Sequence, residues 1–161
     1  MPTLPQLIED DIRELNNALQ ALLLKSEAGV GLVIDKGGFI ITRLGQTDGF
    51  DLMTLAALSA ASYAATETIA GLVGEMNFSS VYQQGDSYSL LVMNVDANCL
   101  LVLVFRAAIS VGAIKYYAVD TTKQIAKQLQ VAQKRAPGEG LDLSMLNLAD
   151  ASEVFRAKKS A

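Results

Sequence analysis

The residue types that enzymes use for proton transfer, nucleophilic attack and metal binding are scarce in this sequence. It contains no histidine, which removes the imidazole base, the histidine metal ligand and the serine-histidine triad. Its one cysteine, Cys99, opens an apolar run, where packing is the ordinary role of a thiol. The adjacent acids Glu9, Asp10 and Asp11 suit the start of a helix, whose dipole favours negative charge, and they need no metal. We therefore expect no catalytic residue, no metal site and no cofactor.

Patterns for binding phosphate are missing as well. No glycine-rich loop ends in Gly-Lys-Ser or Gly-Lys-Thr, and Gly29 and Gly31 precede a strand-like run instead of opening a helix. The net charge of −4 and the pI near 4.8 argue against a nucleic-acid partner. Arg43, Arg106 and Arg135 are scattered, and we interpret each as a solvated charge. The sequence thus favours a binding protein over an enzyme.

Composition indicates one soluble domain. A chain of 161 residues is long enough to bury about two-thirds of its unfolded surface in a single core. The first 26 residues carry acids where a secretory leader would be basic and then apolar, and no apolar run approaches about 20 residues. A single cysteine suits a reducing compartment. We expect a cytoplasmic protein that does not insert into a membrane.

Residues 51–74 predict a long helix that is apolar on nearly every side. Asp51 is a suitable N-cap, Gly74 a suitable stop, and Glu67 is the only other charge between them. One apolar stripe is expected to lie on a sheet: Leu52, Leu55, Leu58, Ile69 and Leu72. Small side chains in two i, i+4 ladders would allow another backbone to approach closely: Ala56, Ala60, Ala64 and Ala57, Ala61, Ala65. Either other molecules cover these ladders, or the helix is enclosed by a larger core of its own chain.

The rest of the pattern completes the element order αββαβββα. Further helices are expected at residues 4–26, capped by Thr3, and at 112–135, and strands at 30–35, 39–44, 78–84, 87–95 and 99–105. The fully apolar run 99–105 should be central, and the polar run 78–84 should be an edge. The predicted fold class is α+β: a five-stranded antiparallel sheet with the apolar helix on one face and two one-sided helices on the other.

An edge strand beside an uncovered helix predicts a homodimer. Pairing two copies edge to edge would continue the sheet across a two-fold axis and set the two central helices side by side. The residues expected at this interface are Ala60, Tyr63, Val81 and Tyr82.

Several motifs resemble one known family. They are LVIDKGGFII in the first hairpin, L-x-T-L-A-x-L-x-A followed by A-A-T, I-A and L-V-G-E in the central helix, the LVLVF strand, and V-G at the start of the last helix. Over about residues 5–135 the chain resembles the roadblock/dynein light chain domain family, and within it the bacterial MglB group.

The resemblance implies a roadblock domain over residues 4–135 and a homodimer whose paired central helices bind a small Ras-like GTPase of the MglA type. It also implies that the chain activates the GTPase by reshaping the GTPase's own active site, without an arginine finger. The matching positions for GTPase binding are Ala57, Ala61, Ala64 and Thr68. Ala61 stands where relatives often have glycine, and Tyr63 where they carry a small residue.

The C-terminal part divides into a Pro/Gly-rich linker at 136–140 and a tail at 141–161. Apolar or small residues recur in the tail at helical spacing, at Met145, Leu148, Ser152 and Phe155. Some relatives carry a C-terminal helix that binds the GTPase and promotes nucleotide exchange, although this tail ends in basic residues where theirs is acidic. The alternatives are a frayed tail and a tail folded on its own domain.

Three functions remain open at this point. The first is a dimer that regulates a GTPase, and the second is a scaffold that only recruits a GTPase or a motor component. The third is a small-molecule sensor, for which the sequence offers no charged cluster to line a pocket.

Overall fold

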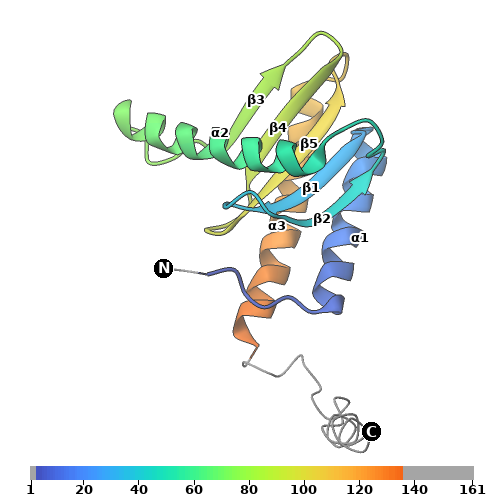
Figure 1. The fold of residues 1–161 in the computed structure, drawn as a ribbon, viewed down its shortest axis with the longest axis vertical. Helices are drawn as coiled ribbons and strands as arrows, with labels where there is room; N and C mark the ends of the chain where they lie inside the picture. Colours follow the sequence, from blue (N-terminus) through green and yellow to red (C-terminus); the bar gives the residue numbers. More distant parts are fainter. Residues whose placement is uncertain (1–2, 136–161) are drawn as a thin grey trace, which may run out of the picture.

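A five-stranded antiparallel sheet separates two helical layers in the computed structural model, which describes residues 3–135 (Figure 1). The elements are α1 (Glu9–Ser26), β1 (Val30–Asp35), β2 (Ile40–Gly45), α2 (Leu52–Leu72), β3 (Ser80–Gln84), β4 (Tyr88–Asn94), β5 (Cys99–Arg106) and α3 (Val111–Lys134). The predicted fold class and element order are confirmed.

The strand order is β2-β1-β5-β4-β3, and every neighbouring pair is antiparallel. β5 lies in the middle, and Cys99 through Phe105 are all buried, because helices cover both faces of this strand. β3 lies at one edge, as its polar sequence predicts, and β2 lies at the other.

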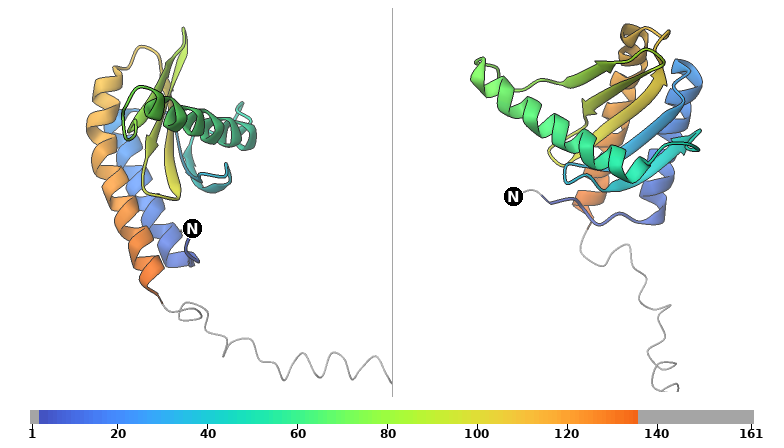
Figure 2. Two further views of the ribbon diagram at one scale, coloured as in Figure 1. Left: turned by 90° about the vertical axis from the view of Figure 1, so that its left-hand side faces the viewer. Right: turned by 45° about the horizontal axis from the view of Figure 1, so that its top comes forward.

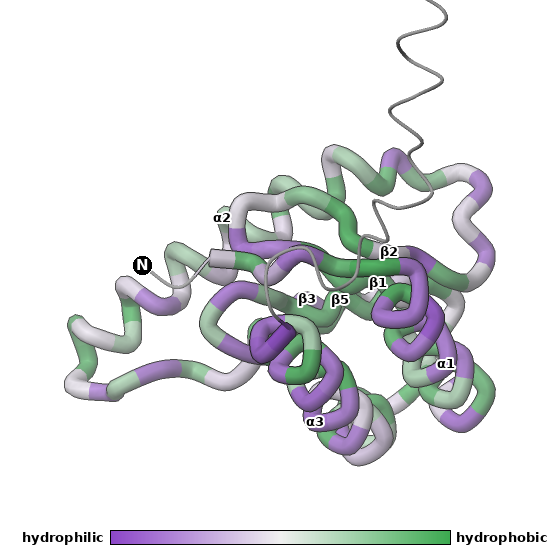
Figure 3. Tube along the Cα trace, turned by 90° about the horizontal axis from the view of Figure 1, so that it is seen from below, coloured by the Kyte–Doolittle hydropathy of each residue, from purple (hydrophilic) through white to green (hydrophobic). Residues whose placement is uncertain are grey.

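The helices α1 and α3 pack side by side on one face of the sheet (Figure 2). Both alternate hydrophilic and hydrophobic residues along the chain (Figure 3). Their inner sides meet the sheet in one buried cluster that includes Leu15, Leu19, Leu22, Ile114 and Leu129. This arrangement confirms the expected pair of one-sided helices.

The start of α1 differs from the prediction. The helix begins at Glu9 instead of residue 4, and Thr3 is not its cap. Pro5 disfavours helical backbone at the residue before it, and Leu4 and Leu7 pack against the core from an irregular segment. The Asp11 carboxylate accepts a hydrogen bond from the Ile8 backbone N–H at 2.9 Å, and this bond caps the N-terminus of the helix.

The face of α2 that meets the sheet also differs from the prediction. The buried residues are Leu52, Ala56, Ser59, Ala60, Tyr63 and Ala70, whereas Leu58, Ile69 and Leu72 are 63%, 50% and 82% exposed. Because this helix is apolar on nearly all sides, its sequence does not show which side is buried. Steric fit against the sheet determines the buried side. Here Tyr63, Leu52 and four of the small residues pack inward, and Leu58 and Leu72 point outward. Asp51 caps the helix as predicted, accepting the Thr54 N–H at 3.1 Å.

The turn between β1 and β2 contacts α2 near its N-terminal end, at Ala57. Gly38 has φ +93°, and a Cβ at this position would lie 2.8 Å from the Ala57 Cα. Only glycine combines this backbone conformation with such a close approach. The hairpin therefore fixes the position of α2 above the sheet.

Within residues 3–135, no helix combines the length and the apolarity needed to cross a membrane. The predicted linker 136–140 and the predicted tail residues Met145, Leu148 and Phe155 lie outside the described residues.

Candidate functional site

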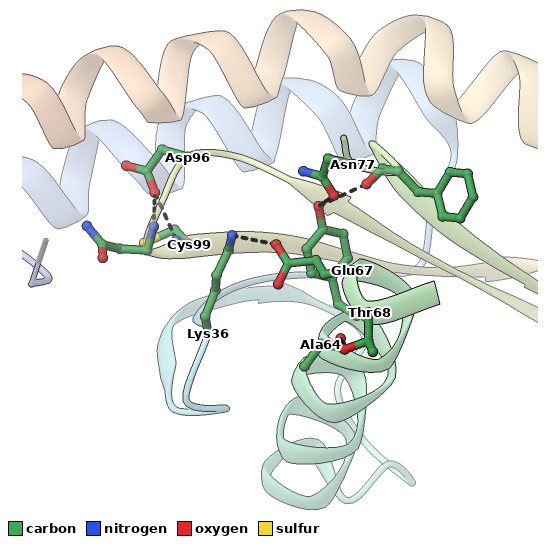
Figure 4. A network of polar contacts seen from close by, with 10 residues as sticks. Lys36, Ala64, Glu67, Thr68, Asn77, Asp96 and Cys99 are labelled. Atoms are coloured by element: carbon green, nitrogen blue, oxygen red, sulfur yellow. Dashed lines mark hydrogen bonds and ion pairs between the residues drawn. The ribbon is translucent and has the colours of Figure 1, made fainter. Parts of the chain in front are cut away.

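The outer side of α2 presents a continuous stripe of small residues. Ala57, Ala61, Ala64 and Thr68 are all exposed and follow one another at spacings of three or four residues. The Thr68 hydroxyl donates to the Ala64 carbonyl oxygen at 3.2 Å, which ties the polar end of this side chain to the helix backbone (Figure 4). We call these four residues the docking stripe. A partner helix or loop can approach the α2 backbone closely along it.

An ion pair borders the docking stripe on the hairpin side. The Lys36 ammonium lies 3.3 Å from Glu67, the only charged residue of α2, and 5.4 Å from the centre of the Tyr63 ring (Figure 4). Both side chains are partly exposed, so the pair contributes little stability. The pair places one acidic and one basic side chain beside an otherwise uncharged surface.

Tyr63 points into the protein, away from the docking stripe. Its side chain is 1% exposed, and its hydroxyl donates to the Phe78 carbonyl oxygen at 3.0 Å and lies 3.4 Å from the Asn77 Oδ1 (Figure 4). Burial raises the pKa of Tyr63 above its ordinary value, so the hydroxyl remains a donor. The large residue at this position therefore leaves the approach to the docking stripe open.

Replacing Tyr63 with phenylalanine tests this attachment. The Phe78 carbonyl would lose its donor, and we expect the free energy of unfolding to fall by about 1 kcal/mol. Tyr116→Phe is the matched control, because Tyr116 is 75% exposed on α3. Urea unfolding should separate the two variants, and equal stabilities would show that the Tyr63 hydroxyl contributes nothing.

The predicted dimer residues fall into two groups. Ala60 and Tyr63 are 5% and 1% exposed within the single chain, because both pack on the sheet, so they have little surface left for a second copy. Val81 and Tyr82 lie on the edge strand β3 and are partly buried, and the Tyr82 ring stacks on Phe105 with centroids 6.3 Å apart. Only the β3 residues keep surface at the predicted interface.

A second exposed stripe lies on α2 beside the docking stripe. It consists of Leu58, Ile69 and Leu72, and Val73 and Met76 continue it beyond the helix with exposures of 63% and 101%. The C-terminal turns of α2 extend past the strand β3 in two views (Figures 1 and 2). We call Leu58, Ile69 and Leu72 the leucine stripe. Large apolar side chains left in water beside a free sheet edge are typical of an interface between chains.

The described residues provide no reactive centre near these stripes. Cys99 is fully buried, and desolvation raises the pKa of its thiol to about 12. Between residues 3 and 135, no three acidic, histidine or cysteine side chains are grouped to hold a metal ion. The Arg106 guanidinium lies over the Tyr88 ring at 5.1 Å, and Arg43 is exposed on β2.

One charged cluster was missed at the sequence level, where Arg135 was interpreted as a solvated charge. Its guanidinium donates to both carboxylate oxygens of Asp11, at 2.8 and 3.0 Å, and Gln128 donates to the same group at 2.7 Å. Asp11 is fully buried, and the hydrogen bonds from Arg135 lower its pKa to about 2. Asp11 and Arg135 are 124 positions apart, so no local sequence pattern indicates that they form a pair.

Solved structures share this arrangement. No protein-family model and no curated protein matches the sequence, so the likeness rests on structure. The gliding protein MglB from Thermus thermophilus is 27% identical, with a TM-score of 0.74 over 81% of this chain and 99% of that one. MglB in a tetrameric arrangement is also 27% identical, with a TM-score of 0.75 over 82% of this chain and 99% of that one. A roadblock/LC7 domain from Streptomyces avermitilis shares the fold at 16% identity, with a TM-score of 0.63 over 69% and 93% of the two chains.

The sheet and its helices have the fold of the roadblock/LC7 domain. The chain is similar to MglB in both structure and sequence.

Proposed function

We propose that this chain is a homodimeric regulator of a small Ras-like GTPase of the MglA type, and that it activates GTP hydrolysis. The observation that carries the proposal is the docking stripe: four small, exposed, uncharged positions in line on α2. These are the positions that the family resemblance assigns to GTPase binding. A cytoplasmic role in cell polarity or motility belongs to the same proposal.

The dimer uses the leucine stripe and the free edge of β3. Two copies related by a two-fold axis would extend the sheet through β3 and bring the two α2 helices together along Leu58, Ile69 and Leu72. The proposed interface contains the leucine stripe of α2 in place of the buried Ala60 and Tyr63. Val81 and Tyr82 of β3 remain part of it. The docking stripes of both copies would then lie on one surface, open to one GTPase.

A charged substitution in the leucine stripe should weaken the dimer. Leu72→Glu would place a carboxylate among apolar side chains, and we expect the dimer dissociation constant to rise at least about tenfold. Leu24→Glu is the matched control, because Leu24 on α1 is 77% exposed and Leu72 is 82% exposed. Sedimentation equilibrium over a range of concentrations gives the constants. Equal constants for both variants and the unchanged chain would place the interface elsewhere.

The chain would act on the GTPase by changing the shape of the GTPase's active site. α2 contains no arginine or lysine, and its docking stripe contains no charged side chain, so it offers no group to insert beside the nucleotide. Acceleration would then come from positioning groups that the GTPase already has, in place of an inserted arginine, which in other GTPases is worth about 10³-fold to 10⁵-fold in kcat.

A scaffold that only recruits the GTPase is the second candidate function, and the same uncharged surface suits it. Single-turnover hydrolysis of GTP by a Ras-like GTPase, measured with and without saturating amounts of this chain, separates the two. Faster hydrolysis supports activation. If the rate does not change although binding is demonstrated in the same mixture, the chain acts only as a scaffold.

Nucleotide exchange promoted by the C-terminal tail is part of this proposal. The residues concerned are Met145, Leu148 and Phe155. Release of a fluorescent GDP analogue from the GTPase, compared between the full chain and a chain that ends at residue 136, would report the effect of the tail.

A further inference from the structure

An apolar groove of about 700 Å³ lies between the β1–β2 hairpin and α2. Residues 37–43 form one wall, and Met53 and Ala57 form the other. Phe39 and Met53 are 75% and 77% exposed, although both are large and apolar. A groove with such walls is a site for an apolar segment.

The groove runs along a free sheet edge. β2 pairs only with β1, so the backbone N–H and C=O groups on its outer side have no strand partner within residues 3–135. The pairing of β1 with β2 shifts register at Ile41, and this shift determines the direction of the β2 side chains. Ile41 and Leu44 pack toward α1 and α3. The Thr42 hydroxyl donates to the Asn16 side chain of α1 at 2.5 Å. Ile40 packs with the cluster on the α2 side, and Arg43 also lines the groove. An added strand would find both backbone partners and an apolar wall there.

The described chain ends at the same end of the sheet as the turn of this hairpin (Figure 1). Arg135 is bound to Asp11 at the start of α1, and the segment before α1 is bound to the β4–β5 turn, where Asn98 donates to the Thr3 carbonyl at 3.4 Å. The Lys36 backbone N–H in turn donates to the Asn98 carbonyl at 2.8 Å. The C-terminal end of α3 and the β1–β2 turn therefore lie at the same end of the sheet (Figure 1). The chain continues from there into residues 136–161.

The sequence after the linker has the pattern that an edge strand needs. Leu141, Leu143 and Met145 alternate with Asp142 and Ser144, and a period of two places all three apolar side chains on one face. Residues 141–155 carry acids at 142, 150 and 153 and no basic residue. The groove lining contains one charged side chain, Arg43, whose sign is opposite.

We propose that residues 141–145 dock in this groove of the same chain and pair with the outer edge of β2, with Leu143 directed toward Met53. Because Ala57 belongs to both the groove and the docking stripe, the docked segment covers one end of the surface assigned to the GTPase. The coverage of a GTPase-binding surface rests on the proposed function, whereas the docking of residues 141–145 in the groove does not.

Disulfide cross-linking in the full chain tests the docking without any GTPase. Cys99 is fully buried, so the only reactive thiols are those introduced. The test chain carries Met53→Cys and Leu143→Cys, and the control carries Glu14→Cys and Leu143→Cys. Glu14 is exposed on the opposite helical layer, one turn from Asp11 and hence near the point where the described chain ends. A segment that samples the surface at random would reach Glu14 at least as fast.

We expect the disulfide within one chain to form at least about tenfold faster in the Met53 pair than in the Glu14 pair. Equal rates, a faster Glu14 pair, or bonds only between two chains would overturn the proposal. Hydrogen exchange of the β2 amides gives a second measurement. Leu143→Asp should speed exchange at β2 about tenfold, and Ser144→Asp, whose side chain points away from the groove, should not. Exchange that is identical in both variants would also overturn it.

Discussion

Ala64→Arg is expected to abolish GTPase binding while the chain stays folded and dimeric. Ala64 lies in the middle of the docking stripe and is exposed, so an arginine can extend into solvent without disturbing the sheet. A partner backbone that approaches α2 closely would meet a long charged side chain, because the two surfaces fit only around small residues. We expect the dissociation constant to rise at least about 100-fold, which corresponds to about 2.8 kcal/mol.

The control for this substitution is Ala113→Arg. Ala113 is also an exposed helical alanine, but it lies in the first turn of α3 on the opposite side of the sheet. Titration calorimetry with the GTP-bound GTPase measures both variants, and circular dichroism and sedimentation check fold and dimer mass. If Ala64→Arg and Ala113→Arg bind the GTPase equally well, the docking stripe is not the contact surface.

The sheet was predictable because strand signals are local. Val30–Asp35 matches its prediction residue for residue, and the other strands begin and end within two residues of theirs. Glycines at the turn and an unbroken apolar run in β5 determine the hairpin and the central position. A sequence therefore predicts this part of the fold from spacing alone.

The orientation of α2 was not predictable in the same way. Periodicity finds a buried side only where polar residues mark the other side, and α2 has one charge in 21 residues. The packing of Tyr63 and the close contact of Gly38 with Ala57 decide its rotation. The docking residues were nevertheless placed on the exposed side, because they came from the family resemblance and not from periodicity. The binding of a GTPase there stays a prediction.

The pairing of Asp11 with Arg135 could not be read from the sequence, because acids in a first helical turn have a sufficient local reason. In the structure, the buried carboxylate accepts hydrogen bonds from Arg135, Gln128 and the Ile8 N–H. These bonds hold the N-terminus of α1 against the C-terminus of α3. Both the irregular segment before α1 and the end of α3 at Arg135 are positioned by this one carboxylate.

Arg135→Ala should therefore be strongly destabilising. The substitution leaves the fully buried Asp11 carboxylate without its counter-charge, and we expect the free energy of unfolding at pH 7 to fall by about 3 kcal/mol. Asp10→Asn is the neighbouring control, because its side chain is 67% exposed and its ion pair with Arg13 lies at the surface. Urea unfolding followed by circular dichroism should show little change for that variant.

The pH dependence gives a sharper test of the same contact. Hydrogen bonds from Arg135, together with those from the Ile8 N–H and Gln128, lower the pKa of Asp11 from 3.8 to about 2, so the unfolded chain takes up this proton at a higher pH than the folded chain does. The contribution of Asp11 to stability is thus complete above about pH 5 and is lost as the pH falls toward 2. The difference in unfolding free energy between the unchanged chain and Asp11→Asn should be largest at neutral pH and shrink by about 2 kcal/mol over that interval. A difference that stays constant from pH 5 to pH 2 would mean that Asp11 titrates alike in both states, and that the ion pair does not hold the two helix ends together.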